Sequence, residues 1–208
     1  MRRLLLVRHA PTGATRAACF PLDEPLDERA RCDAELLGAR LPSRRYELLC
    51  SPALRCHQTA AAAGLAEPLV VAEIAECDFG SWAGRSLADV DEVDPEAAAA
   101  WINDPHARAH GGESLTAFAA RVGAWLDRQA RRDGAAVAIT HGGVVKAAVM
   151  HALGVPLGAF WRIDCAPLSI TELHAHDGRW TLTRCNCVAD VPRHTGNIRH
   201  DRHVGARS

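Results

Sequence analysis

The feature that most constrains the fold is the apolar run Leu4–Val7, which leads directly into Arg8 and His9. Such a run is too short for a helix and has no polar alternation, so it predicts a strand that is buried on both faces of a parallel sheet. Ligands of such sheets bind at the carboxyl ends of the strands. An arginine and a histidine at that end therefore predict a site for an anionic group, although such a pair can also simply terminate a strand.

Composition limits the classes of partner. The chain has 208 residues, of which 48% are hydrophobic and 24% charged, and its formal net charge is -1. This composition suits one folded domain with an ample core. The near-neutral charge argues against nucleic acid as the main partner, because proteins that bind it usually carry an excess of basic residues. The apolar stretch ends at Arg8, too early for an export signal or a membrane span. We therefore expect no membrane partner, a cytoplasmic location and reduced cysteines; Cys185 and Cys187 match no common zinc spacing.

Strands and helices alternate along most of the chain. Strands are predicted from short apolar runs at 46–50, 69–71, 135–140, 168–174 and 180–185, the last two joined by a turn at 176–179. Cap residues and apolar periodicity predict helices at 27–41, at 86–103 and at 144–153, the second of them with a break near Pro95. Two more helices are predicted to start at Ser51-Pro52 and at Ser114, and the one from Ser114 has an apolar stripe through Leu126. Pro21, and Pro25 just after it, predict that the segment from Thr12 to Glu24 is irregular, because proline is poorly accommodated inside a helix.

Further chemistry-bearing residues follow the later strands. His141-Gly142-Gly143 comes directly after the strand at 135–140, so a second apolar strand ends in a histidine. Glycines at the start of the next helix leave backbone N–H groups open to an anion. Arg55 lies in the opening turn of the helix after the second strand, and Glu76 follows the third strand. We expect all of these side chains at one edge of the sheet.

Together these residues have the chemistry of a phosphate site. Guanidinium groups of Arg8 and Arg55 can match the charge on phosphoryl oxygens. A neutral imidazole such as His9 can attack phosphorus in line and form a phosphohistidine. Glu76 can protonate the leaving oxygen and then activate water. Burial near apolar neighbours would raise the pKa of its carboxyl, as this role requires. A protonated His141 would stabilise the transferring group.

The ordered set resembles the signatures of the histidine phosphatase superfamily, also called the phosphoglycerate mutase-like family. Its Arg-His-Gly signature corresponds to Arg8-His9-Ala10, its Ser-Pro-Leu-x-Arg segment to residues 51–60, its Glu-x-x-x-Gly loop to Glu76–Gly80, and its second His-Gly to His141-Gly142. The resemblance covers roughly residues 3 to 173. It implies a three-layer α/β/α sandwich with a mostly parallel central sheet and no metal or organic cofactor. The roles it implies are nucleophile for His9, proton donor for Glu76, and phosphate ligands for Arg8, Arg55 and His141.

Other segments refine the resemblance. Cys19–Leu26 and Gly111–Ser114 resemble the corresponding stretches of the α-ribazole phosphatase branch, although Pro21 stands where that branch has glycine. Ala10 likewise replaces the glycine that usually follows the nucleophile, which could change how closely the backbone approaches a phosphate. The segment between Gly84 and Gly112 is shorter than the insertions typical of mutases, which favours hydrolysis.

The predicted organisation is a histidine phosphatase domain over 1–187, a helical lid insertion at about 85–112 and a polar tail over 188–208. The predicted function is metal-independent hydrolysis of a phosphomonoester of a small phosphorylated metabolite. Two alternatives stay open: phosphoglycerate mutase-type transfer, and a non-catalytic module that binds a phospho-ligand. The oligomeric state is open, with a homodimer as one option. Residues expected to bind the substrate beyond the phosphate are Thr12, Thr15, Phe20, Trp82, Ser114 and Gly142.

Overall fold

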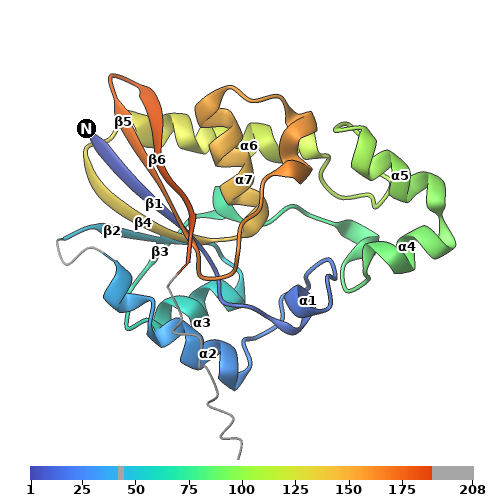
Figure 1. Cartoon of the computed structure of the whole chain (residues 1–208), viewed down its shortest axis with the longest axis horizontal. Helices are drawn as coiled ribbons and strands as arrows, with labels where there is room; N and C mark the ends of the chain where they lie inside the picture. Colours follow the sequence, from blue (N-terminus) through green and yellow to red (C-terminus); the bar gives the residue numbers. More distant parts are fainter. Residues whose placement is uncertain (42–44, 189–208) are drawn as a thin grey trace, which may run out of the picture.

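The computed structural model describes residues 1–41 and 45–188. Within them, a six-stranded sheet with the strand order β3-β2-β4-β1-β5-β6 lies between two layers of helices (Figure 1). The first four strands in this order run parallel, whereas β5 is antiparallel to β1 and β6 is antiparallel to β5. The expected α/β/α sandwich with a mostly parallel sheet is therefore confirmed. The strands are β1 (Arg2–Arg8), β2 (Glu47–Cys50), β3 (Leu69–Val70), β4 (Gly134–Thr140), β5 (Ile170–His176) and β6 (Arg179–Cys187).

The central strand β1 is buried on both faces, as its unbroken apolar run predicts. Leu4 and Leu6 belong to the hydrophobic cluster on one side of the sheet, and Leu5 and Val7 to the cluster on the other. This alternation follows from the two-residue period of a strand. Because both faces are covered, the polar residues that follow Val7 emerge only at the end of the strand.

Four long helices form the outer layers. α2 (Glu28–Glu35) and α3 (Leu54–Ala62) cover one face of the sheet, and α6 (Leu115–Ala130) and α7 (Gly142–Leu153) cover the other (Figure 1). The prediction of α6 is confirmed, because Phe118 and the other residues of its apolar stripe are buried. These layers bury both faces of the sheet, so that only the strand ends are open to a ligand.

Some predicted boundaries are wrong. The helix after β2 does not begin at Ser51-Pro52: its N-cap is Ala53, and its first residue is Leu54. The segment from Thr12 to Glu24 is not wholly irregular, because the Thr12 side chain accepts a hydrogen bond from the backbone N–H of Thr15 and caps a short helix, α1 (Gly13–Arg16). A polar cap here starts a helical turn upstream of the prolines.

The region expected as an insertion forms α4 (Leu87–Val93) and α5 (Pro95–Asn103), which lie together at one side of the molecule (Figure 1). The predicted break near Pro95 is confirmed: Asp94 ends α4 and caps α5, and Pro95 occupies the first position of α5. Of the expected tail, residues 189–208 lie outside the described residues.

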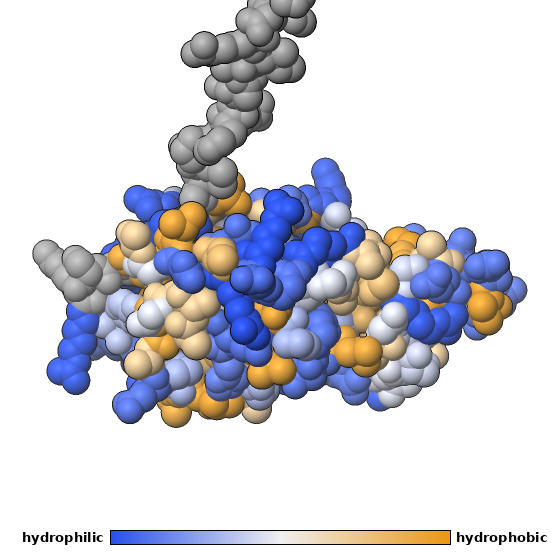
Figure 2. Space-filling view, turned by 90° about the horizontal axis from the view of Figure 1, so that it is seen from below, coloured by the Kyte–Doolittle hydropathy of each residue, from blue (hydrophilic) through white to orange (hydrophobic). Residues whose placement is uncertain are grey.

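The surface is mixed in character. In the face shown in Figure 2, polar residues predominate and apolar residues occur in small groups among them. Among the described residues, no helix combines the length and the apolar character needed to cross a membrane.

Candidate active site

The carboxyl ends of β1, β4 and β2 meet at one edge of the sheet and bring the candidate residues together. Backbone hydrogen bonds fix the three ends: the N–H of His9 donates to Thr140 at 2.8 Å, and the N–H of Ser51 donates to Ile139 at 2.9 Å. His141 follows Thr140 and lies edge-on to His9, with ring centroids 5.2 Å apart. The two histidines are thus held by adjacent parallel strands rather than by mobile loops.

His9 is buried, and its tautomer can be assigned from its partners. Its Nδ1 lies 2.6 Å from the carbonyl oxygen of Ala10, which can only accept, so Nδ1 carries the proton. Nε2 accepts a hydrogen bond from Nε of Arg55 at 3.2 Å and therefore bears a lone pair. Burial, helped by the charge of Arg55, lowers the pKa of His9 to about 3. The imidazole is neutral at ordinary pH, with Nε2 as its nucleophilic atom.

His141 has the opposite tautomer. Its Nδ1 lies 3.2 Å from Nη2 of Arg55, which can only donate, so the proton is on Nε2 and is donated to Oγ of Ser51 at 2.7 Å. Burial, and after it the neighbouring His9 ring, which competes for a proton, and the charge of Arg55, lower the pKa of His141. A bound phosphoryl group would add negative charge and favour the imidazolium.

Two arginines supply positive charge. Arg55 is 4% exposed; besides contacting both histidines, it donates to the carbonyl oxygen of Leu22 at 2.7 Å. Arg8 donates to the carbonyl oxygen of Cys165, while its Nε is buried with no hydrogen-bond partner in the described part of the chain. Within that part, neither guanidinium forms an ion pair. The pair can therefore accommodate an anion.

The Glu76 carboxyl faces the same site from the segment between η2 (Ala72–Ile74) and η3 (Gly80–Trp82). Its two oxygens accept hydrogen bonds from the backbone N–H groups of Cys77, at 3.1 Å, and Gly143, at 3.3 Å. Burial nevertheless outweighs these bonds and the nearby arginines, and the pKa of Glu76 is raised. A raised pKa suits a group that must deliver a proton.

Gly143 explains why a second glycine follows His141. A Cβ at Gly143 would lie 2.2 Å from Oε1 of Glu76, and a Cβ at Gly142 would lie 3.3 Å from Nε of Arg8. At Gly143, α7 therefore approaches Glu76 more closely than a side chain would allow, whereas a side chain at Gly142 would require only a small shift of Arg8.

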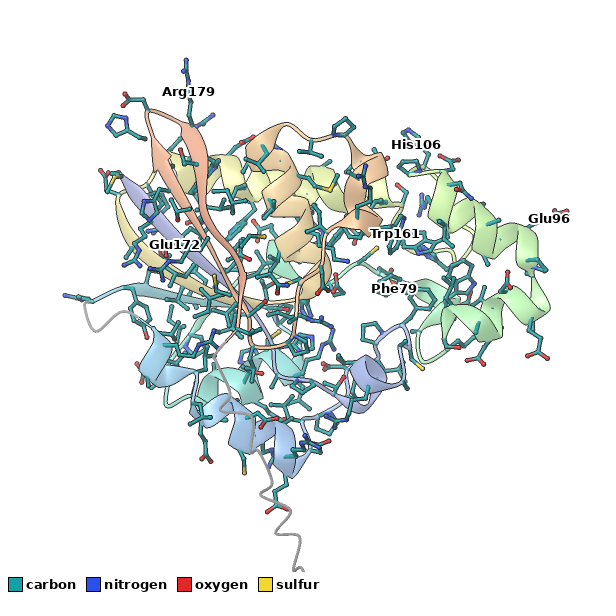
Figure 3. All side chains as sticks on the ribbon, viewed as in Figure 1. Phe79, Glu96, His106, Trp161, Glu172 and Arg179 are labelled. Carbon is teal, nitrogen blue, oxygen red and sulfur yellow. The ribbon has the colours of Figure 1, made fainter. Side chains whose placement is uncertain are left out.

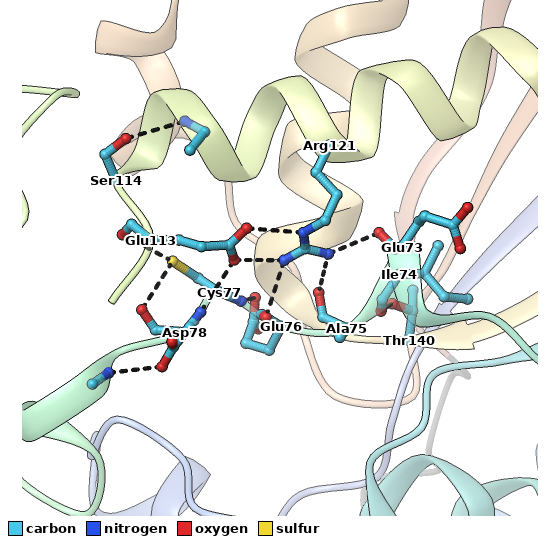
Figure 4. Close-up of polar contacts among 12 residues, drawn as sticks. Glu73, Ile74, Ala75, Glu76, Cys77, Asp78, Glu113, Ser114, Arg121 and Thr140 are labelled. Atoms are coloured by element: carbon cyan, nitrogen blue, oxygen red, sulfur yellow. Dashed lines mark hydrogen bonds and ion pairs between the residues drawn. The ribbon is translucent and has the colours of Figure 1, made fainter. Parts of the chain in front are cut away.

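Arg121 of α6 holds the Glu76 segment in place (Figure 4). It donates to the carbonyl oxygens of Glu73 at 2.8 Å, Ala75 at 3.1 Å and Glu76 at 3.3 Å, and it pairs with the Glu113 carboxylate at 2.6 Å. Sequence reasoning missed this arginine. The available signal was Glu113 within the Gly-Gly-Glu-Ser stretch, since a partly buried carboxylate calls for a cation.

Two adjoining cavities open beside the charged groups. The first, of about 200 Å³, is lined by Arg8 and Glu76 together with Phe79 and Trp161. The second, of about 500 Å³, shares Glu76 and both aromatic residues with the first. Trp101 of α5 lines both as well. Phe79 and Trp161 lie on the side of the body that faces α4 and α5 (Figure 3). The charged site thus opens onto an aromatic wall.

The residues expected to bind the rest of a substrate divide into two groups. Phe20 and Gly142 line the first cavity, and Phe20 also lines the second. Trp82 is buried behind Phe20, at 5.5 Å between ring centroids. The other three make local contacts: Thr12 caps α1 and donates to Glu24, Thr15 contacts the Thr12 hydroxyl, and Ser114 caps α6. None of these three, nor Trp82, lines the two cavities.

Ala10 is accommodated without strain. It is absent from the non-glycine residues with positive φ, so its backbone does not require glycine. Its N–H donates to Oγ1 of Thr59 at 3.0 Å, and its side chain packs with Leu26, Ala30 and Ala34. The methyl group points into the core rather than toward the charged site.

Comparisons with known proteins agree with this geometry. Phosphoserine phosphatase 1 of Hydrogenobacter thermophilus is 30% identical over 203 residues, covering 92% of this chain and 95% of that protein. Glucosyl-3-phosphoglycerate phosphatase of Mycobacterium tuberculosis is 31% identical over 218 residues, covering 91% and 96%. The crystal structure of a putative α-ribazole-5'-P phosphatase from Escherichia coli superposes with a TM-score of 0.80 at 27% identity, covering 89% of this chain and 96% of that one. The model of the histidine phosphatase superfamily (branch 1) matches residues 4–188, and the chain belongs to that family.

Proposed function

We propose that this chain is a metal-independent phosphomonoesterase that acts through a phosphohistidine on His9. The observation that carries the proposal is the state of the buried His9 imidazole, which is neutral and has its Nε2 lone pair directed at the guanidinium of Arg55. A nucleophilic nitrogen beside a cation cluster with spare donors suits attack on an anionic phosphorus centre.

In the proposed first step, the phosphoryl oxygens bind Arg8, Arg55 and His141, taking over the contacts that Arg55 makes with the two histidines. Nε2 of His9 attacks phosphorus, the ester P–O bond breaks, and Glu76 gives its proton to the leaving oxygen. In the second step, the Glu76 carboxylate takes a proton from water, the water oxygen attacks phosphorus, and the P–N bond breaks. Inorganic phosphate leaves, and both residues regain their initial states.

We infer that the substrate is a small phosphorylated metabolite. The two cavities, of about 200 and 500 Å³, suit a small organic carrier. The substrates in the names of the relatives support this substrate class: phosphoserine, glucosyl-3-phosphoglycerate and α-ribazole-5'-P are all compact phosphorylated molecules. Trp101 supports a lid role for the segment at 85–112, because it brings α5 to the wall of both cavities.

The test is phosphate release from a panel of phosphorylated metabolites in the presence of EDTA. We expect release from at least one sugar phosphate, phosphorylated hydroxy or amino acid, nucleotide or α-ribazole phosphate, and loss of release in His9→Ala with folding retained. Native-level release by His9→Ala would contradict the mechanism. Complete lack of hydrolysis, together with retained binding of phosphorylated ligands, would favour the non-catalytic binding module.

A second assay distinguishes hydrolysis from mutase chemistry. The protein is incubated with 3-phosphoglycerate and 2,3-bisphosphoglycerate, and both isomerisation and free phosphate are followed. We expect isomerisation to be slower than phosphate release from the best substrate of the panel. Rapid isomerisation without phosphate release would overturn the phosphatase assignment.

A further inference from the structure

The first cavity contains a cation that the proposed chemistry does not use. Lys146 is the only lysine of the chain, and it lines this cavity together with Arg8, Glu76 and Gly142. It lies four residues after Gly142 on α7, so both residues share one face of the helix. One helical turn, about 5.4 Å, separates it from the helix start at which the phosphoryl group is proposed to bind.

Among the residues that the structure describes, the ammonium of Lys146 has no anionic partner within ion-pair distance. Within the described residues it forms no hydrogen bond or ion pair, and its Nζ lies 5.3 Å from the centroid of the Phe160 ring. Asp164 lines the same cavity, but its oxygens accept hydrogen bonds from other groups: Oδ1 from the N–H of Cys165 at 2.8 Å, and Oδ2 from Nδ2 of Asn186 at 3.5 Å. Burial lowers the pKa of Lys146, and the charge of Arg8 adds to this, while Asp164 and Glu76 act in the opposite direction. A partly buried ammonium without a counter-ion is a site where a ligand's negative charge would be stabilising.

We propose that Lys146 binds a carboxylate on the substrate and that the enzyme prefers phosphomonoesters of hydroxy acids, in which a carboxylate lies a few bonds from phosphorus. This inference rests on the proposed function. A carboxylate suits the site better than a second phosphate does. One monovalent cation faces this part of the cavity, and the Asp164 carboxylate, which lines the same cavity, would repel a dianion more strongly than a monoanion.

The test compares ester pairs that differ in the carboxylate: 3-phosphoglycerate with glycerol 3-phosphate, and phosphoserine with phosphoethanolamine. In the unaltered enzyme we expect a higher kcat/KM for the carboxylated member of each pair. Lys146→Met should lower kcat/KM for that member by about ten- to a hundredfold, mainly by raising KM, because a charged hydrogen bond present in both ground and transition states is lost. Carboxylate-free members should lose several-fold less.

Two variants serve as controls. Lys146→Arg keeps a cation and should restore much of the preference, which a purely packing role for the side chain would not predict. Arg179→Met removes the same charge at the exposed turn of β5 and β6, far from the cavity (Figure 3). It should leave the preference unchanged, so an effect of net charge alone would be detected.

Binding measured without turnover separates this inference from the proposed function. In a His9→Ala background, calorimetry should show tighter binding of 3-phosphoglycerate than of glycerol 3-phosphate, and Lys146→Met should remove the difference. Equal binding of the two ligands would overturn the role of Lys146 even if phosphate release is normal. An equal loss for both members of each pair would make Lys146 a ligand of the phosphoryl group instead. A clear binding preference in a protein that hydrolyses nothing would support Lys146 while contradicting the phosphatase.

Discussion

At the scale of single residues, burial shifts the pKa values of His9 and Glu76 in opposite directions. The same exclusion of water that lowers the pKa of the imidazole raises that of the carboxyl, so burial favours the neutral form of both groups. The sequence could predict both residues, because each follows a strand of the same sheet. It could not predict that Arg55 bridges the two histidines or that Lys146 lines the first cavity, since both depend on side-chain directions after packing.

The proposed role of Glu76 as proton donor predicts that the rate depends on the leaving group. Glu76→Gln cannot donate a proton, so it should slow alkyl phosphates by about 100-fold or more while affecting p-nitrophenyl phosphate much less, because only alkoxides need an acid. Steady-state kcat/KM for both substrates measures this. An equal loss on both would argue against Glu76 as the proton donor.

The raised pKa of Glu76 also sets the direction of the pH profile. For an alkyl phosphate, kcat/KM should fall as pH rises through that raised pKa, because the acid is lost, and this limb should be weak for p-nitrophenyl phosphate. Profiles of the two substrates on the same enzyme provide the comparison. Activity on the alkyl ester that rises over this range would contradict the assignment.

At the scale of elements, the site depends on the close approach of strand ends to the start of α7. Sequence patterns predicted the strand ends and the break at Pro95 because these depend on local apolar runs and on proline. They placed the start of α3 wrongly: Ser51 resembles an N-cap, but its hydroxyl accepts from His141, a partner from another strand. The Arg121 contacts were missed for the same reason, since α6 meets the Glu76 segment only in the folded chain.

Gly143 tests this close approach. Gly143→Ala places a methyl group against Oε1 of Glu76, so the carboxyl must move, and we expect a loss of at least about tenfold in kcat for alkyl phosphates. Gly158→Ala is a matched control, because nothing lies within 4 Å of the added Cβ. Unfolding by urea should show both variants folded. Full activity in Gly143→Ala would show that the contact does not matter.

At the scale of the whole molecule, the sheet gathers the proposed catalytic residues from four separate stretches of chain and keeps His9 and His141 buried. The layered architecture could be predicted from the alternation of strands and helices in the sequence. The pairing of β1 with β4, which are far apart in sequence, could not, and this pairing brings His9 and His141 together. Burial of neutral histidines has a thermodynamic consequence, because the unfolded chain can protonate them and the folded chain resists it.

Stability should therefore depend on pH in a defined direction. The pKa of His141 is lowered on folding, and that of His9 falls from 6.5 to about 3. Between these values the unfolded state binds more protons, so both residues reduce the free energy of unfolding as pH falls below 6.5. The excess stability of the native chain over His141→Gln should shrink over this interval in urea titrations. A difference that grows on acidification would contradict the buried neutral state.

The central claim is that the phosphoryl group passes through His9, and trapping it there is the most direct measurement. Rapid mixing of substrate with the enzyme, followed by alkaline quench and mass spectrometry of the peptide that contains His9, should show one added phosphoryl group that is stable to base and lost in acid. The His9→Ala variant should show none. A phosphoryl group found on another residue, an acid-stable adduct, or steady turnover with no adduct at any quench time would contradict the account.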